Sequence, residues 1–517
     1  MATATAATGR TVTTSIPARL DRLPWSRWHW TIVVGLGTVW ILDGLEVTVV
    51  GNIASRLSEP GSGLSITSGQ VTGVAAALYV AGACTGALFW GRLTDRWGRK
   101  RLFMITLAVY LAATALTALS FQAWWFFLFR FLTGFGIGGE YAAINSAIDE
   151  LIPANHRGRV DLIINGSFWV GAVGGSLLSI LALNTGFLAA DVGWRMTFAL
   201  GAVLALVILL VRRHVPESPR WLLIHGRDRE AEEVVADIEG RVEAEKGEPL
   251  PEPHGEITIH QRRSVSFVEI GRTVFADYRR RAVLGFSLFI GQAFLYNAIT
   301  FGFGAILTKF FDVPSDRTGY YFAVIAVGNF MGPLLLGKLF DTVGRRVMIS
   351  CTYLLSGVLL FSTAWLFHSG ALSAVTLTAC WCVVLFFASA GASSAYLTVS
   401  EIFPMETRAM SIAFFYAIGT AAGGISGPLL FADLTGTGRI GDTVLAFSVG
   451  AALMCAAGLV AAFLAVDAER RSLEDIAKPL TAVAQKAKAA TKGGGHQDTR
   501  PPDVTPPDAT PPSSSPA

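Results

Sequence analysis

The chain has 517 residues, of which 52% are hydrophobic and only 15% are charged, with a formal net charge of +3 and a mean hydropathy of +0.50. Soluble domains carry about 25% charged residues, so this composition excludes a string of ordinary water-soluble domains and indicates a polytopic membrane protein. The small net charge gives no sign of a nucleic-acid partner.

Small and polar residues dominate the start of the chain, which lacks the apolar core of a cleavable signal peptide, so we expect a cytoplasmic N-terminal tail over 1–27. Apolar segments of about 20 residues, the length of a bilayer-spanning helix, then recur. They cover 30–54, 70–91, 102–120, 124–148, 162–185, 195–211, 282–308, 319–338, 347–368, 371–398, 410–431 and 444–466. Strands of a membrane barrel would be about ten residues long and would alternate in polarity. We therefore predict an all-α membrane protein with twelve transmembrane helices.

Ionisable residues interrupt the first six apolar segments, which together span 28–211. Asp43 and Glu46 lie three residues apart in "ILDGLEVTVVGN", so they share one helix face, while Arg130 and Glu140 lie in the fourth segment. A charge at the bilayer centre costs about 2.5–3.5 kcal/mol and usually marks an ion or substrate path. We expect the two acids to face the bundle interior, where a carboxylate that takes up and releases a proton supports proton coupling.

A charged connection over 212–281 separates these segments from the second six, which span 282–466. Within it, "GRDREAEEVVADIEGRVEAEK" carries charges at i,i+4 spacing and predicts a solvated helix. The last part, 467–517, ends in Pro-, Thr- and Ser-rich sequence that cannot bury a core, and we expect a largely disordered cytoplasmic tail.

Basic residues set the expected orientation. They gather in the connections 91–101, 155–160 and 338–346, whereas the alternate connections 186–194 and 432–443 are nearly free of Lys and Arg. Because cytoplasmic loops carry the excess of Lys and Arg, we expect both termini in the cytoplasm and a multi-pass protein of the cell membrane.

The two halves of the chain repeat each other. Six residues of "GACTGALFWGRLTDRWGRK" recur in "GNFMGPLLLGKLFDTVGRR" at a constant offset of 328 − 82 = 246. They are Gly82, Gly86, Gly91, Asp95, Gly98 and Arg99, matched by Gly328, Gly332, Gly337, Asp341, Gly344 and Arg345. A second set, Glu150, Pro153 and Arg157, recurs as Glu401, Pro404 and Arg408. Two parallel halves of six helices imply an alternating-access carrier with a central site.

The repeated pattern G-x-L-x-D-x-x-G-R-[KR] resembles the signature of the major facilitator superfamily. The segments "RFLTGFGIGGE" (130–140), "PESPRWL" (216–222) and "SEIFPMETR" (400–408) resemble its sugar-porter and metabolite–proton symporter branch, and the resemblance covers about 28–475. It implies a conformational latch and gate made of Gly91, Asp95, Arg99, Glu150, Arg157, Asp341, Arg345, Glu401 and Arg408. Glu140 is a further candidate gate or network residue, with packing as the alternative.

The same resemblance assigns the proton. In proton-coupled sugar porters an Asp of the first helix pairs with an Arg of the fourth, and Asp43 and Arg130 match these positions. We therefore predict Asp43 as the proton site and Arg130 as its charge partner, with a permanent salt bridge as the structural alternative. Glu46 is a candidate for a second proton site, a substrate contact or a packing residue.

Six residues are candidates for substrate binding: Asn165, Trp169, Gln292, Tyr296, Asn297 and Tyr396. Gln292 and Asn297 have the spacing of two amides of the sugar porters, but Gly291, Asn165 and Tyr396 stand where those porters carry Gln, Gln and Trp. These departures put a hexose in doubt and leave a polar, sugar- or polyol-like substrate. Interhelical hydrogen bonding is the alternative role for each polar residue.

We predict a secondary active transporter, not an enzyme, that moves a small polar metabolite by proton symport. An aromatic or carboxylic acid is the alternative substrate, and drug-efflux antiport and nutrient signalling are the competing functions. The sequence has no G-x-x-x-x-G-K-[ST] loop and no metal-ligand spacing, so we expect no cofactor and no metal. The expected partners of the monomer are its substrate, a proton and membrane lipid.

Overall fold

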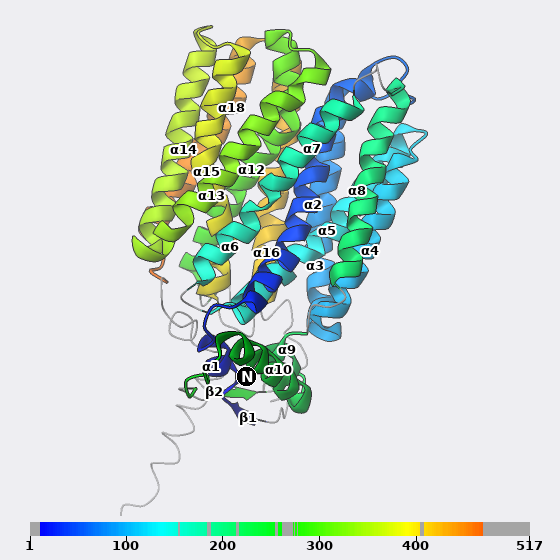
Figure 1. Ribbon diagram of the computed structural model, residues 1–517. Coiled ribbons are helices and arrows are strands. Elements are labelled where there is room, and N and C mark those ends of the chain that lie inside the picture. The colour runs from blue at the N-terminus through cyan, green and yellow to red at the C-terminus, as the bar shows by residue number, and fades with distance from the viewer. Residues whose placement is uncertain are drawn as a thin grey trace, which may run out of the picture.

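The computed structural model describes residues 11–468 except 154–155, 184–187, 213–216, 254–256, 261–271, 273–274, 277 and 404–407. This part of the chain forms two groups of six long helical segments that stand side by side (Figure 1). The arrangement confirms the predicted all-α fold with two six-helix halves.

Each half follows the order of the predicted segments. The N-terminal half comprises α2 (Arg27–Ser58), the π-helical turn η1 (Gln70–Ala75) with α3 (Ala76–Trp97), α4 (Arg99–Ala118), α5 (Ala123–Leu151), α6 (Arg157–Gly166) with α7 (Phe168–Ala182), and α8 (Ala190–Arg212). The C-terminal half comprises α12 (Arg279–Phe311), the 3₁₀ turn η3 (Ser315–Arg317) with α13 (Thr318–Thr342), α14 (Arg345–His368), α15 (Ala374–Ile402), α16 (Arg408–Thr420) with the π-helical turn η4 (Ala421–Ile425) and α17 (Ser426–Gly436), and α18 (Ile440–Leu464).

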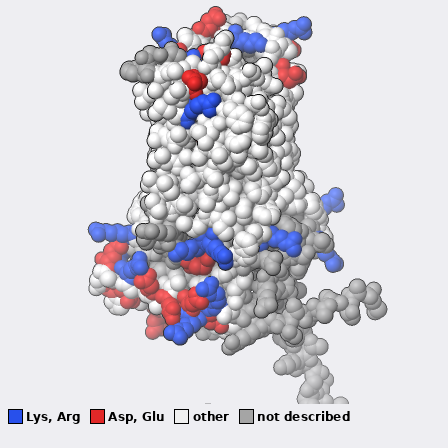
Figure 2. All heavy atoms as spheres, turned by 90° about the vertical axis from the view of Figure 1, so that its right-hand side faces the viewer, with Lys and Arg blue, Asp and Glu red and all other residues white. Residues whose placement is uncertain are grey.

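The outer surface of the bundle is apolar at mid-height. Figure 2 shows Lys, Arg, Asp and Glu gathered at the two ends of the molecule, with a belt almost free of charge between them. Large apolar side chains such as Trp365 and Phe463 point outward and are 68% and 77% exposed. Within the described residues, eleven helical segments are long and apolar enough to cross a membrane, and α5, which holds Arg130 and Glu140, is the further long helix. The belt is the surface expected of a protein solvated by lipid tails.

Close helix packing reproduces the sequence repeat in space. A Cβ atom at Gly86 of α3 would lie 2.2 Å from the carbonyl oxygen of Phe135 in α5, and one at Gly332 of α13 would lie 2.1 Å from that of Phe386 in α15. These contacts are equivalent, because 332 − 86 = 246 and 386 − 135 = 251, the same offsets that relate the two repeated motifs. Only glycine permits this backbone contact, as is common between membrane helices.

A small unit sits at one end of the bundle, which we call the basal end (Figure 1). It consists of β1 (Thr11–Thr14), α1 (Ile16–Asp21), α9 (Pro219–Ile224), α10 (Asp228–Lys246) and β2 (Ile257–His260). The predicted solvated helix is α10. β1 pairs antiparallel with β2, Thr11 opposite His260, and Arg27 N, where α2 begins, donates to Glu245 Oε2 over 2.8 Å. Parts of the N-terminal segment and of the central connection thus fold together.

The two halves touch near both ends of the bundle. At the basal end, the backbone N–H of Arg159 in α6 donates to Asp341 Oδ2 of α13 over 3.2 Å. Towards the opposite, distal end, a Cβ atom at Gly51 of α2 would lie 2.6 Å from the carbonyl oxygen of Thr300 in α12. The space between the halves is therefore bounded by contacts on both sides.

Candidate functional site

A cavity of about 140 Å³ lies between the two halves at the centre of the bundle. Helices α2, α3, α5, α6 and α7 of the N-terminal half and α12, α15 and α16 of the C-terminal half contribute its lining. Aromatic rings make up most of the larger side chains in this wall: Trp40, Tyr79, Tyr141, Phe168, Trp169, Tyr296, Tyr396 and Tyr416. The central position matches what two pseudo-symmetric halves predict.

Among the described residues that line the cavity, Asp43 supplies the single acidic group. Its carboxylate is buried in the wall, where it accepts a hydrogen bond from the Tyr79 hydroxyl on Oδ1 and one from the Tyr141 hydroxyl on Oδ2. Helices α2, α3 and α5 each contribute one member of this triad. Both oxygens of the acid are thus held by neutral donors rather than by a cation.

Glu46, one turn further along α2, has a different partner. Arg130, which is fully buried in α5, donates from NH1 to Glu46 Oε1, and Thr114 Oγ1 donates to Glu46 Oε2 over 2.9 Å. The guanidinium carbon of Arg130 also lies 4.7 Å from the centre of the Tyr79 ring. Glu46 and Arg130 are absent from the cavity lining, so the pair belongs to the interior of the N-terminal half.

The expected pairing of Asp43 with Arg130 is therefore wrong. Helix α2 starts at the basal end, so Glu46 lies one turn nearer the distal end, and α5 runs the other way with Arg130 near its distal start. The longer Glu46 side chain meets the arginine at that level. Asp43 is left one turn below, at the cavity and beside the two tyrosines.

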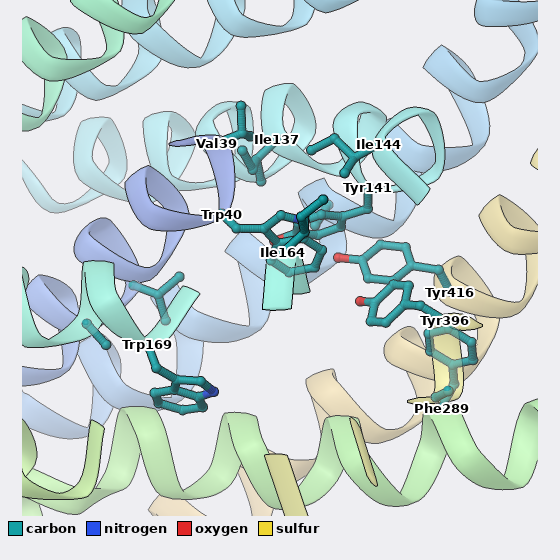
Figure 3. Packing of buried hydrophobic residues seen from close by; sticks show 14 of the residues in the cluster. Val39, Trp40, Ile137, Tyr141, Ile144, Ile164, Trp169, Phe289, Tyr396 and Tyr416 are labelled. Carbon is teal, nitrogen blue, oxygen red and sulfur yellow. The ribbon is translucent and has the colours of Figure 1, made fainter. Parts of the chain in front are cut away.

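A cluster of rings spans the two halves, and we call it the aromatic floor: Trp40, Tyr141, Phe289, Tyr396 and Tyr416. Trp40 stacks on Tyr141 with centroids 4.7 Å apart and planes 21° apart, and Tyr141 meets Tyr416 edge-on at 4.9 Å. Tyr396 contacts Trp40 at 5.8 Å. Figure 3 shows the hydroxyls of Tyr396 and Tyr416 pointing from the C-terminal half towards Trp40 and Tyr141.

All six predicted substrate-binding residues line the cavity: Asn165, Trp169, Gln292, Tyr296, Asn297 and Tyr396. Asn297 Nδ2 donates to the carbonyl of Ala293 over 2.8 Å. The Tyr296 hydroxyl donates to Asn329 Oδ1 over 3.1 Å. The structure brings these residues together, and their role in binding stays a prediction.

Several wall residues were not predicted from the sequence, among them Trp40, Tyr79, Tyr141, Ser389, Ser393 and Tyr416. A signal existed for two of them. Trp40 precedes Asp43 by three residues and therefore shares its helix face, and Tyr141 directly follows Glu140, the last residue of the segment "RFLTGFGIGGE". The other missed residues are Tyr and Ser, which serve in packing contacts between helices as often as in binding sites, so residue type alone does not predict their place in the wall.

The predicted latch residues are described only in part. Arg345 forms a fork onto Glu401, with two N–O distances of 3.1 Å, and its NH1 donates to Asp341 Oδ1 over 2.8 Å. Arg157 is buried at the start of α6, and Gly91 is buried in α3. The side chains of four further residues lie outside the described part of the chain: Asp95, Arg99, Glu150 and Arg408.

Glu140 does not reach the cavity. It is fully buried in α5, and Thr106 Oγ1 of α4 lies 3.4 Å from its Oε1 in donor geometry. This position between two helices of one half agrees with a network or packing contact, and its predicted gating role stays a prediction.

Comparisons with known proteins agree with this architecture. A family model described as "Sugar (and other) transporter" matches residues 30–479. The niacin transporter NiaP of Acinetobacter baylyi is 28% identical over 418 residues, covering 80% of this chain and 89% of that protein. Myo-inositol transporter 2 of Schizosaccharomyces pombe is 29% identical over 414 residues, covering 76% and 72%. The proton:xylose symporter XylE, bound to 6-bromo-6-deoxy-D-glucose, superposes with a TM-score of 0.71 at 18% identity, covering 87% of this chain and 98% of that one.

Proposed function

Because the chain belongs to the sugar transporter family of the major facilitator superfamily, we propose that it drives a small polar metabolite through the cell membrane together with a proton carried by Asp43. The observation that carries this proposal is the position of Asp43. It is an acid in the wall of the central cavity, and it is held by phenol hydroxyls instead of by Arg130. Ionisable groups in such positions inside membrane proteins commonly serve ion coupling.

A proton carrier has to change its charge at low cost. Glu46 is unsuited to this, because protonating it would leave the buried Arg130 cation without its anion. Asp43 has no such constraint, since Tyr79 and Tyr141 are neutral and can turn their hydroxyls when the acid takes up a proton. We therefore assign coupling to Asp43 and a fixed structural charge pair to Glu46 and Arg130.

The wall offers two kinds of contact to a substrate. Amides and hydroxyls, among them Asn165, Gln292 and Asn297, suit the hydroxyl groups of a sugar or polyol. The many rings suit the face of a compact ring compound. We propose a small polar ring compound of sugar or polyol type, in line with the named substrates of the inositol and xylose transporters that the chain resembles.

An aromatic acid is the second candidate, and the stacked rings of the aromatic floor favour it. The niacin transporter among the relatives carries such a compound by its name. Among the described residues, the lining holds no Lys or Arg, so a carboxylate substrate would rely on hydroxyl and amide donors and on a protonated Asp43.

We place the basal end in the cytoplasm, because the basic connections lie there.

Uptake into proteoliposomes tests the proposal. An imposed pH gradient, acidic outside, should drive uphill accumulation of one member of a panel containing xylose, myo-inositol, nicotinate and benzoate. Asp43→Asn should reduce the accumulation ratio to unity while exchange between equal substrate pools continues. Asp316→Asn, which changes an exposed acid in η3, is the matched control and should behave as the unmodified protein. Uphill accumulation by the Asp43→Asn protein would contradict the assignment of the proton.

A further inference from the structure

Tyr141 binds the proposed proton site through its hydroxyl and packs between the two halves through its ring. Its hydroxyl donates to Asp43 Oδ2, at the group proposed to carry the proton. Its ring lies between Trp40 of the same half, at 4.7 Å, and Tyr416 of the opposite half, at 4.9 Å. One side chain therefore connects the acid with the contact between the halves, and Figure 3 shows the Tyr141 ring beside Trp40 and Tyr416.

The contact between the halves at Tyr141 lies on the basal side of Asp43. Trp40 precedes Asp43 on α2, which starts at the basal end, and Tyr416 lies near the basal start of α16. Tyr396 lies in the last turns of α15, about 9 Å from its basal end at a rise of 1.5 Å per residue. Rings of both halves thus meet between Asp43 and the basal end, and Tyr141 with Tyr416 forms a contact between the halves there.

From this geometry we infer that Tyr141 transmits the protonation of Asp43 to the aromatic floor and so couples the proton to the opening of the basal side. The inference rests on the proposed function of Asp43. It assigns to Tyr141 a positioning role, since the tyrosine acts through the acid and through Tyr416 rather than on the proton itself.

The chemistry of the step is a change in hydrogen-bond strength. A charged carboxylate accepts the phenol hydrogen of Tyr141 strongly, whereas the neutral acid formed when a proton binds to one oxygen is a weaker acceptor and gains a donor of its own. Protonation therefore loosens the bond that fixes the Tyr141 ring against Tyr416. When the proton leaves, the carboxylate draws the hydroxyl back and the floor closes.

The surroundings of Asp43 let this change act mainly on Tyr141. On its own helix lies Glu46, whose charge is balanced by Arg130 of α5, and on α3 lies Tyr79. From the C-terminal half, Tyr396 and Tyr416 line the same cavity. Tyr79 also binds the acid, but its ring lies under the Arg130 guanidinium within the N-terminal half, 4.7 Å from its carbon. Losing its bond to Asp43 leaves that anchor in place.

The test compares three variants in proteoliposomes in which proton entry and substrate entry are both recorded. Tyr141→Phe keeps the ring and removes the hydroxyl, so substrate exchange should persist while the number of protons per substrate falls about tenfold. Tyr416→Leu should uncouple in the same way, although it touches no bond to Asp43. Tyr79→Phe should shift the pH at which transport is half-maximal but keep protons and substrate coupled. Tyr320→Phe, an exposed position on α13, checks that the loss of a phenol as such has no effect.

The outcomes separate this inference from the proposed function. A purely structural role of Tyr141 would lower proton and substrate entry together, and that result would overturn the inference, as would unchanged coupling in Tyr141→Phe or equal uncoupling in Tyr79→Phe. Uphill transport by Asp43→Asn would instead remove the proposed function itself. Loss of uphill transport in Asp43→Asn with intact coupling in Tyr141→Phe would leave the proposed function standing and reject only the role of Tyr141.

Discussion

Asp43 and Glu46 are two carboxylates one turn apart on the same helix, and their surroundings differ completely. Glu46 faces the buried guanidinium of Arg130, whereas Asp43 faces the cavity and two phenol hydroxyls. A carboxylate paired with a buried cation keeps its charge, because neutralising it strands the partner. A carboxylate among neutral donors can exchange its proton and pass the change to its neighbours. Position along the helix, rather than residue type, therefore separates a structural charge from a coupling group.

The largest expected effect comes from breaking the Glu46–Arg130 pair. Arg130→Met leaves the Glu46 charge buried without a cation and should lower the free energy of unfolding by about 3–5 kcal/mol. Thermal unfolding of the detergent-solubilised protein measures the loss. The corresponding change at the other acid, Asp43→Asn, should cost much less stability, since it keeps a polar group between Tyr79 and Tyr141.

A double variant sharpens this comparison. Glu46→Leu combined with Arg130→Met removes both charges, so stability should recover most of what the single variant loses. The double variant should still accumulate substrate along a pH gradient, because the proton site is untouched. Loss of proton-driven accumulation with intact substrate exchange would show that Glu46, and not Asp43, is the coupling group.

The sequence predicted the general arrangement because that arrangement follows from local rules. Runs of apolar residues defined the helices, the repeat defined the two halves, and the cost of charge in lipid turned Asp43 and Glu46 inward. It could not decide which acid meets Arg130. That depends on how far α5 is shifted along α2 and on the one extra methylene of Glu46, which are properties of packing between segments distant in the chain.

The aromatic floor and the basal unit show the same limit. Tyr416 meets Tyr141 only after both halves have folded, and a lone Tyr in a membrane helix gives no sign of its partner. The strand β1 is four residues long, and its partner β2 lies on the far side of six membrane helices in the chain. Two strands that are so short and so far apart in the sequence leave no local pattern from which their pairing can be predicted.

The pair Arg345–Glu401 in the C-terminal half can be used to test whether the stability that a buried charge pair contributes depends on hydrogen-bond geometry or on charge alone. Arg345 uses both arms of its fork on Glu401 and a further N–H on Asp341. Arg345→Lys keeps the charge but loses the bidentate contact, and we expect a loss of about 1–2 kcal/mol in the free energy of unfolding. The neighbouring Arg346 is exposed, and its Nε donates to a backbone carbonyl. Arg346→Lys is therefore the control and should lower the free energy of unfolding by less than half as much. Equal losses would mean that the fork contributes nothing.

The smallest expected effect concerns a third paired carboxylate, Glu239 of α10, which lies outside the membrane and can be titrated. Burial alone would raise the pKa of Glu239, but hydrogen bonds from Arg19 and Arg22 outweigh burial, and the pKa is lowered overall. The contacts are 2.5 Å to Arg19 and 2.6 Å to Arg22. Since the folded-state pKa lies below the ordinary one, the stabilisation is fully present at neutral pH and is lost as the pH falls through the folded-state value.

Hydrogen exchange of the segment 11–22 reads out this contact. A partly exposed ion pair contributes about 0.5–1 kcal/mol, so the protection factors of α1, which correct for the slower intrinsic exchange in acid, should fall about two- to fivefold as the solution is acidified. Glu239→Gln should give the lower protection factors at neutral pH and remove their pH dependence. Asp237→Asn breaks the neighbouring exposed pair with Arg241, with side chains 58% and 65% exposed, and should leave exchange of α1 unchanged. If acid leaves the protection factors of α1 unaltered in the unmodified protein, the Arg19 and Arg22 contacts are ordinary surface pairs. Charge pairing would then determine the behaviour of a carboxylate only inside the membrane, where Glu46 and Asp43 differ.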